Sequence, residues 1–248
     1  MLIGISGKIG SGKDTVGKYL QYLYSKEYPH HTFEEFQKYP RWVNNNDWQI
    51  KKYADKLKEI VCLLIGCTRE QLEDINFKNK ELGQEWWYYI DPADMLTMRS
   101  YLEWKDAFED RFLVKLTPRL LLQYLGTECA REIIHPNTWV NALFADYKFI
   151  EVLPNEDTSL FNYNPIYNYP NWIITDVRFP NEADAIKALG GKLIRLTRTT
   201  NVLEEIAMHP SETALDNYNK FDFIIENKGT EEELYTILRE ITSKLISS

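Results

Sequence analysis

The chain has 248 residues, of which 44% are hydrophobic and 27% charged, and its formal net charge is −8. This length suits one large domain, and the composition is that of an ordinary globular protein. The acidic balance argues against a protein that coats nucleic acid, because such binding rests on Lys and Arg contacts to phosphates. It does not exclude a small phosphate-bearing ligand, which needs only a local cluster of cations.

Three features predict a cytoplasmic protein. The cysteines (Cys62, Cys67 and Cys129) are odd in number and lack metal-ligand spacing, so we expect reduced thiols. The longest apolar run, from Ile60 to Ile65, is far shorter than a membrane span. No basic stretch precedes the apolar residues at the start of the chain, so no signal peptide is expected.

The first half of the chain predicts strands and helices in alternation. Residues 2–6 form a candidate buried strand, and the apolar residues within 16–23 have the spacing of a helix with one buried face. A weaker strand is predicted over 48–53. The next helix carries Leu57, Ile60, Val61 and Leu64 on one face, and a third helix is predicted over 119–134, after Pro118.

The second half continues the alternation. Residues 172–175 form an apolar strand that ends at Asp176, and 181–189 form a helix stopped by the two glycines that follow. Strands are predicted over 192–197 and 223–226. In the last helix, Thr230 and Glu233 form a capping box, and the buried stripe consists of Leu234, Ile237, Leu238, Ile241 and Leu245.

About five short strands alternating with helices predict an α/β domain with a parallel sheet, in which ligands bind beyond the carboxyl ends of the strands. We expect a single domain over 1–248. Three stretches interrupt the alternation. Residues 33–46 and 154–171 are predicted as loops, and 76–116 as a helical insertion that forms a substrate-side subdomain or a lid.

The stretch GKIGSGKDT follows the first predicted strand and begins the first predicted helix. Its glycines let the main chain approach a phosphate without a Cβ in the way, and the helix N-terminus directs free N–H groups at the anion. Lys13 then reaches the terminal phosphates as a point charge. The pattern predicts a nucleotide-binding phosphate loop, formed by Gly7, Gly10, Ser11, Gly12, Lys13, Asp14 and Thr15.

Asp14 stands where a phosphate loop usually has Ser or Thr. Magnesium prefers oxygen ligands, many of them waters, so Asp14 can hold the ion through water, and the hydroxyl of Thr15 is an alternative contact. A carboxylate near phosphates is otherwise repelled unless a cation lies between them. Asp14 is therefore either part of a magnesium site or a contact to cationic residues across the active site.

Cations beyond the loop indicate the type of reaction, because phosphoryl transfer needs positive charge around the migrating group. Arg178 and Asp176 come at the end of a predicted strand, and Arg198 follows the next one. Arg119 and Arg131 lie on one predicted helix. Asp176 either holds magnesium through water or caps the following turn.

Seven segments together resemble the deoxynucleoside monophosphate kinases of bacteriophages: GKIGSGKDT, YADKLKE, PRLLLQYLGTECAR with NTWVNALFADY, IITDVRFPNEADAIKALGGKLIRLTR, HPSETALD and DFIIENKGTEEEL. The resemblance covers most of the chain outside the three interruptions, and the GKD form of the loop belongs to that family's pattern. It implies a P-loop nucleoside monophosphate kinase fold with a lid-like segment over 199–216. Residues 76–116 have no clear match.

The resemblance implies transfer of the γ-phosphoryl group of ATP, with Mg²⁺, to the 5′-phosphate of a deoxynucleoside monophosphate (dNMP). The loop would hold the donor phosphates, and Asp176 and Arg178 would lie between donor and acceptor. Arg198 and the segment from His209 to Glu212 would belong to the lid side. Asn227 and Gly229 would lie near the adenine, whereas the acceptor would be contacted by Asp55, Lys56, Arg119, Gln123, Arg131 and Trp139. Trp139 would stack on the base, although a single tryptophan is more often part of a core.

Lys13, Arg131, Asp176 and Arg178 are the candidate catalytic residues. The expected partners are nucleotides, with no stable nucleic-acid or membrane binding, and the sequence leaves a homodimer open. Two rival readings are a kinase for another phosphorylated small molecule, such as dephospho-coenzyme A or phosphomevalonate, and a nucleotide-binding regulator or DNA-associated ATPase. The acidic net charge counts against the second.

Overall fold

The computed structural model describes residues 1–90, 112–152, 166–198 and 210–246. The chain divides into two compact units, which are described separately. The first unit comprises Met1–Asp55 and Asn137–Ser248, and the second comprises Lys56–Pro136. In the described residues, no helix has the length and apolar character needed to cross a membrane.

The first unit is built on a five-stranded parallel sheet, which confirms the predicted fold class. Its order is β2 (Trp48–Lys51), β7 (Asn171–Val177), β1 (Leu2–Gly7), β8 (Lys192–Thr197) and β9 (Phe223–Glu226). Because the strands are parallel, their carboxyl ends share one edge, and the residues after β1, β2, β7 and β8 meet there.

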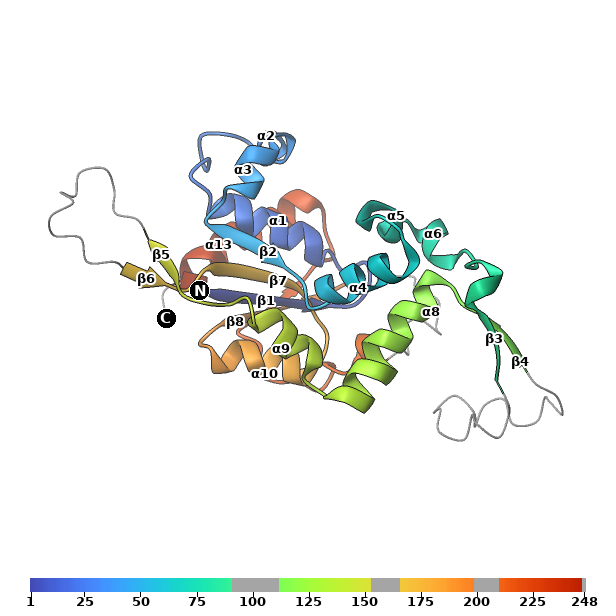
Figure 1. The fold of residues 1–248 in the computed structure, drawn as a ribbon. Coiled ribbons are helices and arrows are strands. Elements are labelled where there is room, and N and C mark those ends of the chain that lie inside the picture. Colours follow the sequence, from blue (N-terminus) through green and yellow to red (C-terminus); the bar gives the residue numbers. More distant parts are fainter. Residues whose placement is uncertain (91–111, 153–165, 199–209, 247–248) are drawn as a thin grey trace, which may run out of the picture. The chain divides into compact units, whose positions relative to one another are not determined.

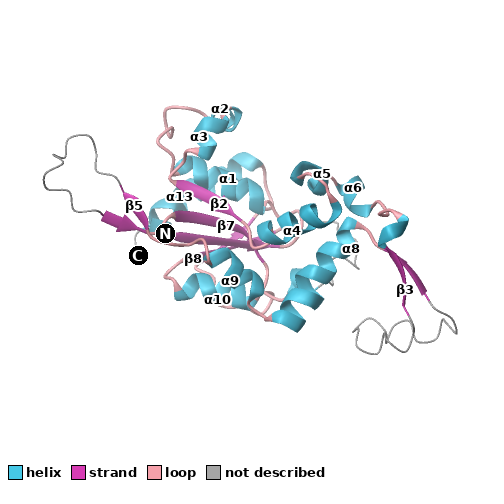
Figure 2. Cartoon of the chain, in the orientation of Figure 1, coloured by secondary structure: helices cyan, strands magenta, loops and turns pink. Residues whose placement is uncertain are grey.

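Helices cover both faces of this sheet (Figures 1 and 2). The helices α1 (Lys13–Leu23) and α13 (Glu231–Ile246) lie on one face, and α9 (Thr138–Phe144) and α10 (Pro180–Ala188) lie on the other. All six residues of β1 are buried, as expected for a central strand covered on both sides. The core between α1, α13 and the sheet includes Ile3, Leu20, Ile173, Ile194 and Leu238, each with 0% of its surface exposed.

Local signals account for the helix ends. In α13 the side chain of Glu233 accepts a hydrogen bond from the amide of Thr230 at 2.8 Å, and the Thr230 hydroxyl accepts one from the amide of Glu233 at 3.3 Å. This is the predicted capping box. After α10, Gly190 has φ of 75°, and the amide of Gly191 donates to the Ile186 carbonyl at 2.9 Å, so the glycines end the helix as expected.

The prediction of a loop over 33–46 was wrong, since the chain there forms α2 (Phe33–Lys38) and α3 (Pro40–Asn44). Thr32 and Glu35 form a capping box that begins α2, and Phe36 anchors it with only 1% of its surface exposed. A single buried aromatic residue and a cap therefore outweigh the polar composition of this stretch.

Strands also occur where loops or helix were predicted. The strands β5 (Ile150–Val152) and β6 (Ile166–Asn168) form a short antiparallel pair, so 154–171 is not loop throughout. The stretch 76–116 contains most of α6 (Ile75–Asn79), the 3₁₀ turn η1 (Gln84–Trp86) and the antiparallel strands β3 (Trp87–Ile90) and β4 (Phe112–Lys115). Its described part is thus not purely helical, and 91–111 lie outside the described residues. The single domain, the substrate-side insertion and the lid stay predictions.

The second unit is mainly helical. It contains α4, which begins at Asp55 and ends at Ile65, α5 (Arg69–Glu73), α6, and the long helix predicted over 119–134. That helix is confirmed, and it has two parts: α8 (Pro118–Gln123) is a regular α-helix, and η3 (Tyr124–Ile134) continues it with π-type hydrogen bonds. The core of the second unit is formed by the buried residues Val61, Leu72 and Leu121.

The predicted buried face of α4 is only partly observed. Val61 is fully buried, and Leu57 packs against the core of the second unit. Ile60 and Leu64 are instead 42% and 49% exposed. Periodicity located the helix correctly, but it could not show how much of the apolar face the neighbouring elements cover.

Candidate active site

The predicted phosphate loop joins β1 to α1 at the carboxyl edge of the sheet. Two of its glycines have positive φ, 76° at Gly10 and 97° at Gly12, a conformation that side-chain-bearing residues rarely adopt. Gly7 is required for another reason. A Cβ there would lie 2.5 Å from Ser11 Oγ and 2.8 Å from the Leu196 carbonyl oxygen. The loop can therefore bring its main chain close to an anion at the N-terminus of α1.

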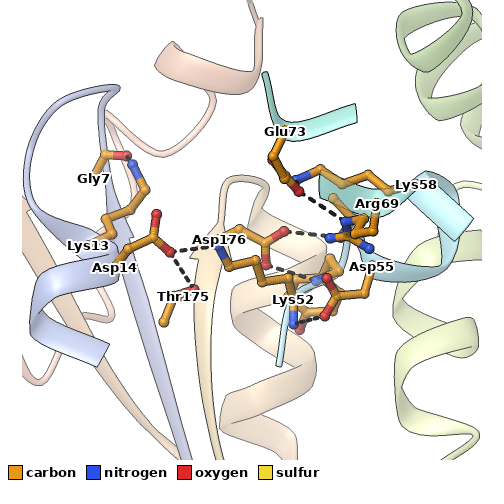
Figure 3. Close-up of polar contacts among 12 residues, drawn as sticks. Gly7, Lys13, Asp14, Lys52, Asp55, Lys58, Arg69, Glu73, Thr175 and Asp176 are labelled. Atoms are coloured by element: carbon orange, nitrogen blue, oxygen red, sulfur yellow. Dashed lines mark hydrogen bonds and ion pairs between the residues drawn. The ribbon is translucent and has the colours of Figure 1, made fainter. Parts of the chain in front are cut away.

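The side chain of Lys13 folds back over this loop. Its Nζ donates hydrogen bonds to the carbonyl oxygens of Gly7 at 2.6 Å and Lys8 at 2.9 Å, the first of which is drawn in Figure 3. Burial and the nearby positive charge of Arg178 lower the pKa of Lys13 from 10.5 to about 8. The ammonium group is thus held in place and poorly solvated, so an anionic ligand would stabilise its charge.

The other end of the loop is anchored by Asn227, which follows β9. Its Nδ2 donates a hydrogen bond to the Ser11 carbonyl oxygen at 2.9 Å. The hydroxyl of Ser11 is buried and has no hydrogen-bond partner among the residues that the structure describes. A buried polar atom without a partner is costly, and a phosphate oxygen is one group that could accept its hydrogen bond.

Asp14 is paired with a cation that the sequence did not indicate. Lys52 Nζ lies 2.7 Å from Asp14 Oδ1, and the Thr175 hydroxyl donates a hydrogen bond to the same oxygen at 3.2 Å (Figure 3). Burial alone would raise the pKa of Asp14, but the ion pair with Lys52 and the hydrogen bond from Thr175 outweigh it and lower the pKa. Asp14 therefore contacts a cationic residue, and its role in a magnesium site stays a prediction.

Asp176 is the penultimate residue of β7, so it lies at the end of the strand, where the sequence placed it. Its two carboxylate oxygens accept hydrogen bonds from the amides of Tyr53 at 2.8 Å and Ala54 at 3.0 Å. Asp176 therefore holds the turn that follows β2. Burial raises the pKa of Asp176, against the effect of the two amides and of Arg178. In the same turn Asp55 accepts a hydrogen bond from the amide of Lys52 at 3.0 Å.

Arg178 begins the connection after β7, as predicted from its place at the strand end. Its amide donates a hydrogen bond to Glu182 Oε2 at 2.8 Å, and its guanidinium forms an ion pair with Glu212. The second carboxylate oxygen of Glu212 accepts a hydrogen bond from the amide of Ile9 at 2.7 Å. Glu212 therefore links Arg178 to the phosphate loop.

Two further predicted donor-side residues lie at neighbouring strand ends. Arg198 is exposed directly after β8, and it borders a cavity of about 560 Å³ that Lys8, Arg195, Tyr218 and Phe221 also line. Gly229 lies in the turn between β9 and α13. His209 lies outside the described residues.

Most residues predicted to contact the acceptor belong to the second unit. There, Arg119 Nε donates a hydrogen bond to Asn79 Oδ1 at 2.7 Å, Gln123 is exposed, and Lys56 and Arg131 are half-buried. Trp139 belongs to the first unit, where it is only 6% exposed. The assignment of these residues to the acceptor stays a prediction.

The second unit also holds a charge cluster around Glu73. Its carboxylate lies 2.6 Å from Lys58 Nζ, 3.0 Å from Arg69 Nε and 3.4 Å from Lys78 Nζ, and Figure 3 labels the first two of these cations. Burial acts to raise the pKa of Glu73, but the hydrogen bonds from Lys58 and Arg69 outweigh it, so the pKa falls to about 2.

The structure brings Lys13, Asp14, Asp176, Arg178 and Asn227 together from three segments of the chain. Sequence reasoning missed three residues that support them, Lys52, Thr175 and Glu182, and it missed the linking role of Glu212. One signal was present, because Lys52 lies near the end of the strand predicted over 48–53 and so near the same edge of the sheet. Within the described ranges there is no cluster of three or more His, Cys, Asp or Glu side chains that could hold a metal ion.

Comparisons with known proteins agree with this geometry. Residues 72–238 match the family model for deoxynucleotide monophosphate kinase. A protein of Acanthamoeba polyphaga mimivirus, provisionally named deoxynucleotide monophosphate kinase, is 27% identical over 95% of this chain and 93% of its own length. The deoxynucleoside-5′-monophosphate kinase of Escherichia phage T5 is 23% identical over 90% of this chain and 91% of its own length. The chain therefore belongs to the deoxynucleotide monophosphate kinase family, and is an enzyme with a nucleotide phosphoryl donor.

Proposed function

We propose that this enzyme transfers the γ-phosphoryl group of ATP to the 5′-phosphate of a dNMP, which gives a deoxynucleoside diphosphate and ADP. One observation carries the proposal. Lys13 is held on a glycine loop at the N-terminus of α1, and Arg178, at the end of β7, is close enough for its charge to lower the pKa of Lys13. Two cations beside a helix N-terminus are what a migrating phosphoryl group requires.

Lys13 would neutralise the terminal phosphates of the donor, while the loop amides and the Ser11 hydroxyl bind their oxygens. Arg178 would stabilise the charge on the group in transit. The attacking oxygen of the acceptor phosphate is already ionised at neutral pH, so no strong general base is needed, and positioning with charge neutralisation supplies the acceleration. Arg131 is proposed as a further catalytic cation, and Lys56, Arg119, Gln123, Asp55 and Trp139 as acceptor contacts.

Asp14 and Thr15 fit a magnesium ion in part. A protein usually supplies Mg²⁺ with one or two carboxylates, and phosphate oxygens and waters complete the octahedron. Asp14 Oδ1 is occupied by Lys52 and Thr175, but Oδ2 makes no hydrogen bond with the residues that the structure describes. We propose that Asp14, with the Thr15 hydroxyl beside it, holds the ion, which when bound would neutralise charge on the donor phosphates.

The substrate test is a coupled assay with ATP and Mg²⁺ and each dNMP and NMP in turn. We expect ADP to form with at least one dNMP, and none with dephospho-coenzyme A or phosphomevalonate. If no dNMP is turned over, the substrate assignment is wrong.

The site test compares two lysines of the same helix. Lys13→Ala should reduce turnover by about 10²–10³-fold, by analogy with removal of a preorganised charge partner. Lys18→Ala is the matched control, because Lys18 is exposed on α1 and should leave turnover unchanged. Near-normal turnover in Lys13→Ala would mean that the loop is not the donor site.

Arg178→Ala separates catalysis from binding. If Arg178 acts mainly on the transition state, its loss should lower kcat more than it raises KM. An increase in KM with unchanged kcat would make it a binding residue only.

A further inference from the structure

Glu212 is a buried carboxylate with two partners from distant parts of the first unit. It belongs to α12 (Pro210–Thr213) and has 5% of its surface exposed. One carboxylate oxygen accepts a hydrogen bond from Arg178 Nη1, and the other accepts one from the Ile9 amide at 2.7 Å. A buried carboxylate is tolerated only when paired and hydrogen-bonded, and these two contacts meet that need.

The contact to Ile9 orients the first half of the phosphate loop. The side chain of Ile9 is 41% exposed, so apolar packing does little to hold this residue. Other contacts fix its neighbours, because Lys13 Nζ binds the carbonyl oxygens of Gly7 and Lys8, and the Ser11 amide binds the Lys8 carbonyl at 3.1 Å. The direction of the Ile9 amide therefore depends on Glu212.

The contact to Arg178 orients the guanidinium. Glu182 fixes the main chain of Arg178 through its amide, but a bond to the amide does not select a rotamer of the long side chain. The Arg178 side chain is 33% exposed, and its ion pair with Glu212 favours the rotamers that direct the guanidinium toward α12. A guanidinium has five N–H donors, and the bond from Nη1 to Glu212 occupies one of them.

We propose that Glu212 is a positioning residue for phosphoryl transfer. Its one carboxylate fixes the guanidinium of Arg178 relative to the Ile9 end of the phosphate loop. This inference rests on the proposed function, in which Arg178 contacts the migrating group. In this role Glu212 acts through Arg178 and the loop, and not by contact with a substrate. Its effect arises because a misplacement of a reacting or stabilising group by about 1 Å can cost about 10²-fold in rate.

The central experiment is the kinetics of Glu212→Gln, which keeps the size of the side chain and removes its charge. We expect kcat to fall about 10–100-fold, with KM for both nucleotides changed less than threefold. Glu226→Gln is the control, since Glu226 is an exposed carboxylate of the same unit that pairs only with exposed Lys228 among the described residues. An unchanged kcat in Glu212→Gln would overturn the proposal.

A second arm asks whether Glu212 acts through Arg178. In the Arg178→Ala background, Glu212→Gln should cost clearly less than in the wild type, because the group that it orients is gone. A radiolabelled-ATP assay gives the sensitivity that this slow background needs. Equal losses in both backgrounds would overturn the proposal. So would tighter binding of a non-hydrolysable ATP analogue by Glu212→Gln, since the carboxylate would then be competing with phosphate.

A third arm needs no substrate, so it separates failure of this inference from failure of the proposed function. In the nucleotide-free protein, the Ile9 amide should exchange its hydrogen at least about tenfold faster in Glu212→Gln than in the wild type, because its acceptor is weakened. The amide of Gly191, hydrogen-bonded far from Glu212 after α10, should exchange at the same rate in both. Equal exchange at Ile9 in both proteins would overturn the positioning of the loop, whichever nucleotide the enzyme uses.

Discussion

Affinity for ATP should fall as the pH rises past about 8, because the phosphate loop relies on the charge of Lys13. Burial and the positive charge of Arg178 both disfavour the protonated form, and they lower the pKa of Lys13 to about 8. Below this pH the side chain is an ammonium ion that attracts phosphate. Above it, the side chain is neutral, and ATP binding must be coupled to uptake of a proton.

The size of the effect follows from that pKa. If only the protonated form binds, the dissociation constant is multiplied by 1 plus the ratio of neutral to charged lysine. This factor is about 1.1 at pH 7 and about 11 at pH 9, so the affinity should fall about tenfold between the two. The last ionisation of a phosphate group has a pKa near 6, so the ligand contributes little over this range.

The assay is a titration with a non-hydrolysable ATP analogue, followed by the fluorescence of the protein's tryptophans, at constant salt and Mg²⁺. Lys13→Arg should bind with an affinity that does not change with pH, because a guanidinium stays charged throughout. Lys18→Arg should keep the wild-type dependence. An equal dissociation constant at pH 7 and pH 9 in the wild type, or the same rise in Lys13→Arg, would refute the reasoning.

Three further predictions concern stability and local charge. Lys52→Ala should raise the pKa of Asp14 towards its ordinary value, as seen by NMR titration, yet cost less than about 1 kcal/mol of stability, since the Asp14 side chain is 64% exposed. An unchanged pKa would mean that the ion pair is not formed in solution. Glu73→Gln should destabilise the protein by about 1 kcal/mol at pH 7, a value discounted for the 46% exposure of Glu73. Burial acts to raise the pKa of Glu73, but the neighbouring cations outweigh it, so the pKa in the folded protein is about 2. The stabilisation by Glu73 is therefore complete above pH 4.5, its ordinary pKa, and is lost as the pH falls to about 2. Urea unfolding of both proteins at several pH values checks it, and a difference that persists at pH 2 would contradict it. Gly17→Ala should cost about 1–3 kcal/mol in the same assay, although alanine favours helix, because its Cβ would lie 2.4 Å from the Thr175 methyl carbon. A more stable variant would show that Thr175 can move away from the added methyl group at little cost.

The sequence alone determined the elements whose signals are local. The strand over 2–6, the glycine loop and the helix over 16–23 follow from a short apolar run, glycines and a 3.6-residue period, and the structure reproduces all three. The final helix was equally well defined by its capping box and its apolar stripe. The place of Arg178 just after a strand was also predictable, because the strand itself was clear.

Local signals misled where burial depends on a few contacts. The stretch 33–46 is polar, yet one buried residue, Phe36, and the Thr32 cap make it helical. The cap was readable as Thr followed three residues later by Glu. The anchoring of Phe36 was not, because its packing against the core of α1 and α13 involves residues far away in the chain.

Only the tertiary structure decided which charges meet at the edge of the sheet. The strand order places β2 next to β7, so Lys52 lies beside Thr175 and reaches Asp14 on α1. Glu212 joins Arg178 and Ile9 across 34 and 203 residues of chain. Such pairings depend on the order of the strands and on the path of the connections between them. A local period or motif does not encode this order, because it is set by burial of the whole sheet and not by any one segment.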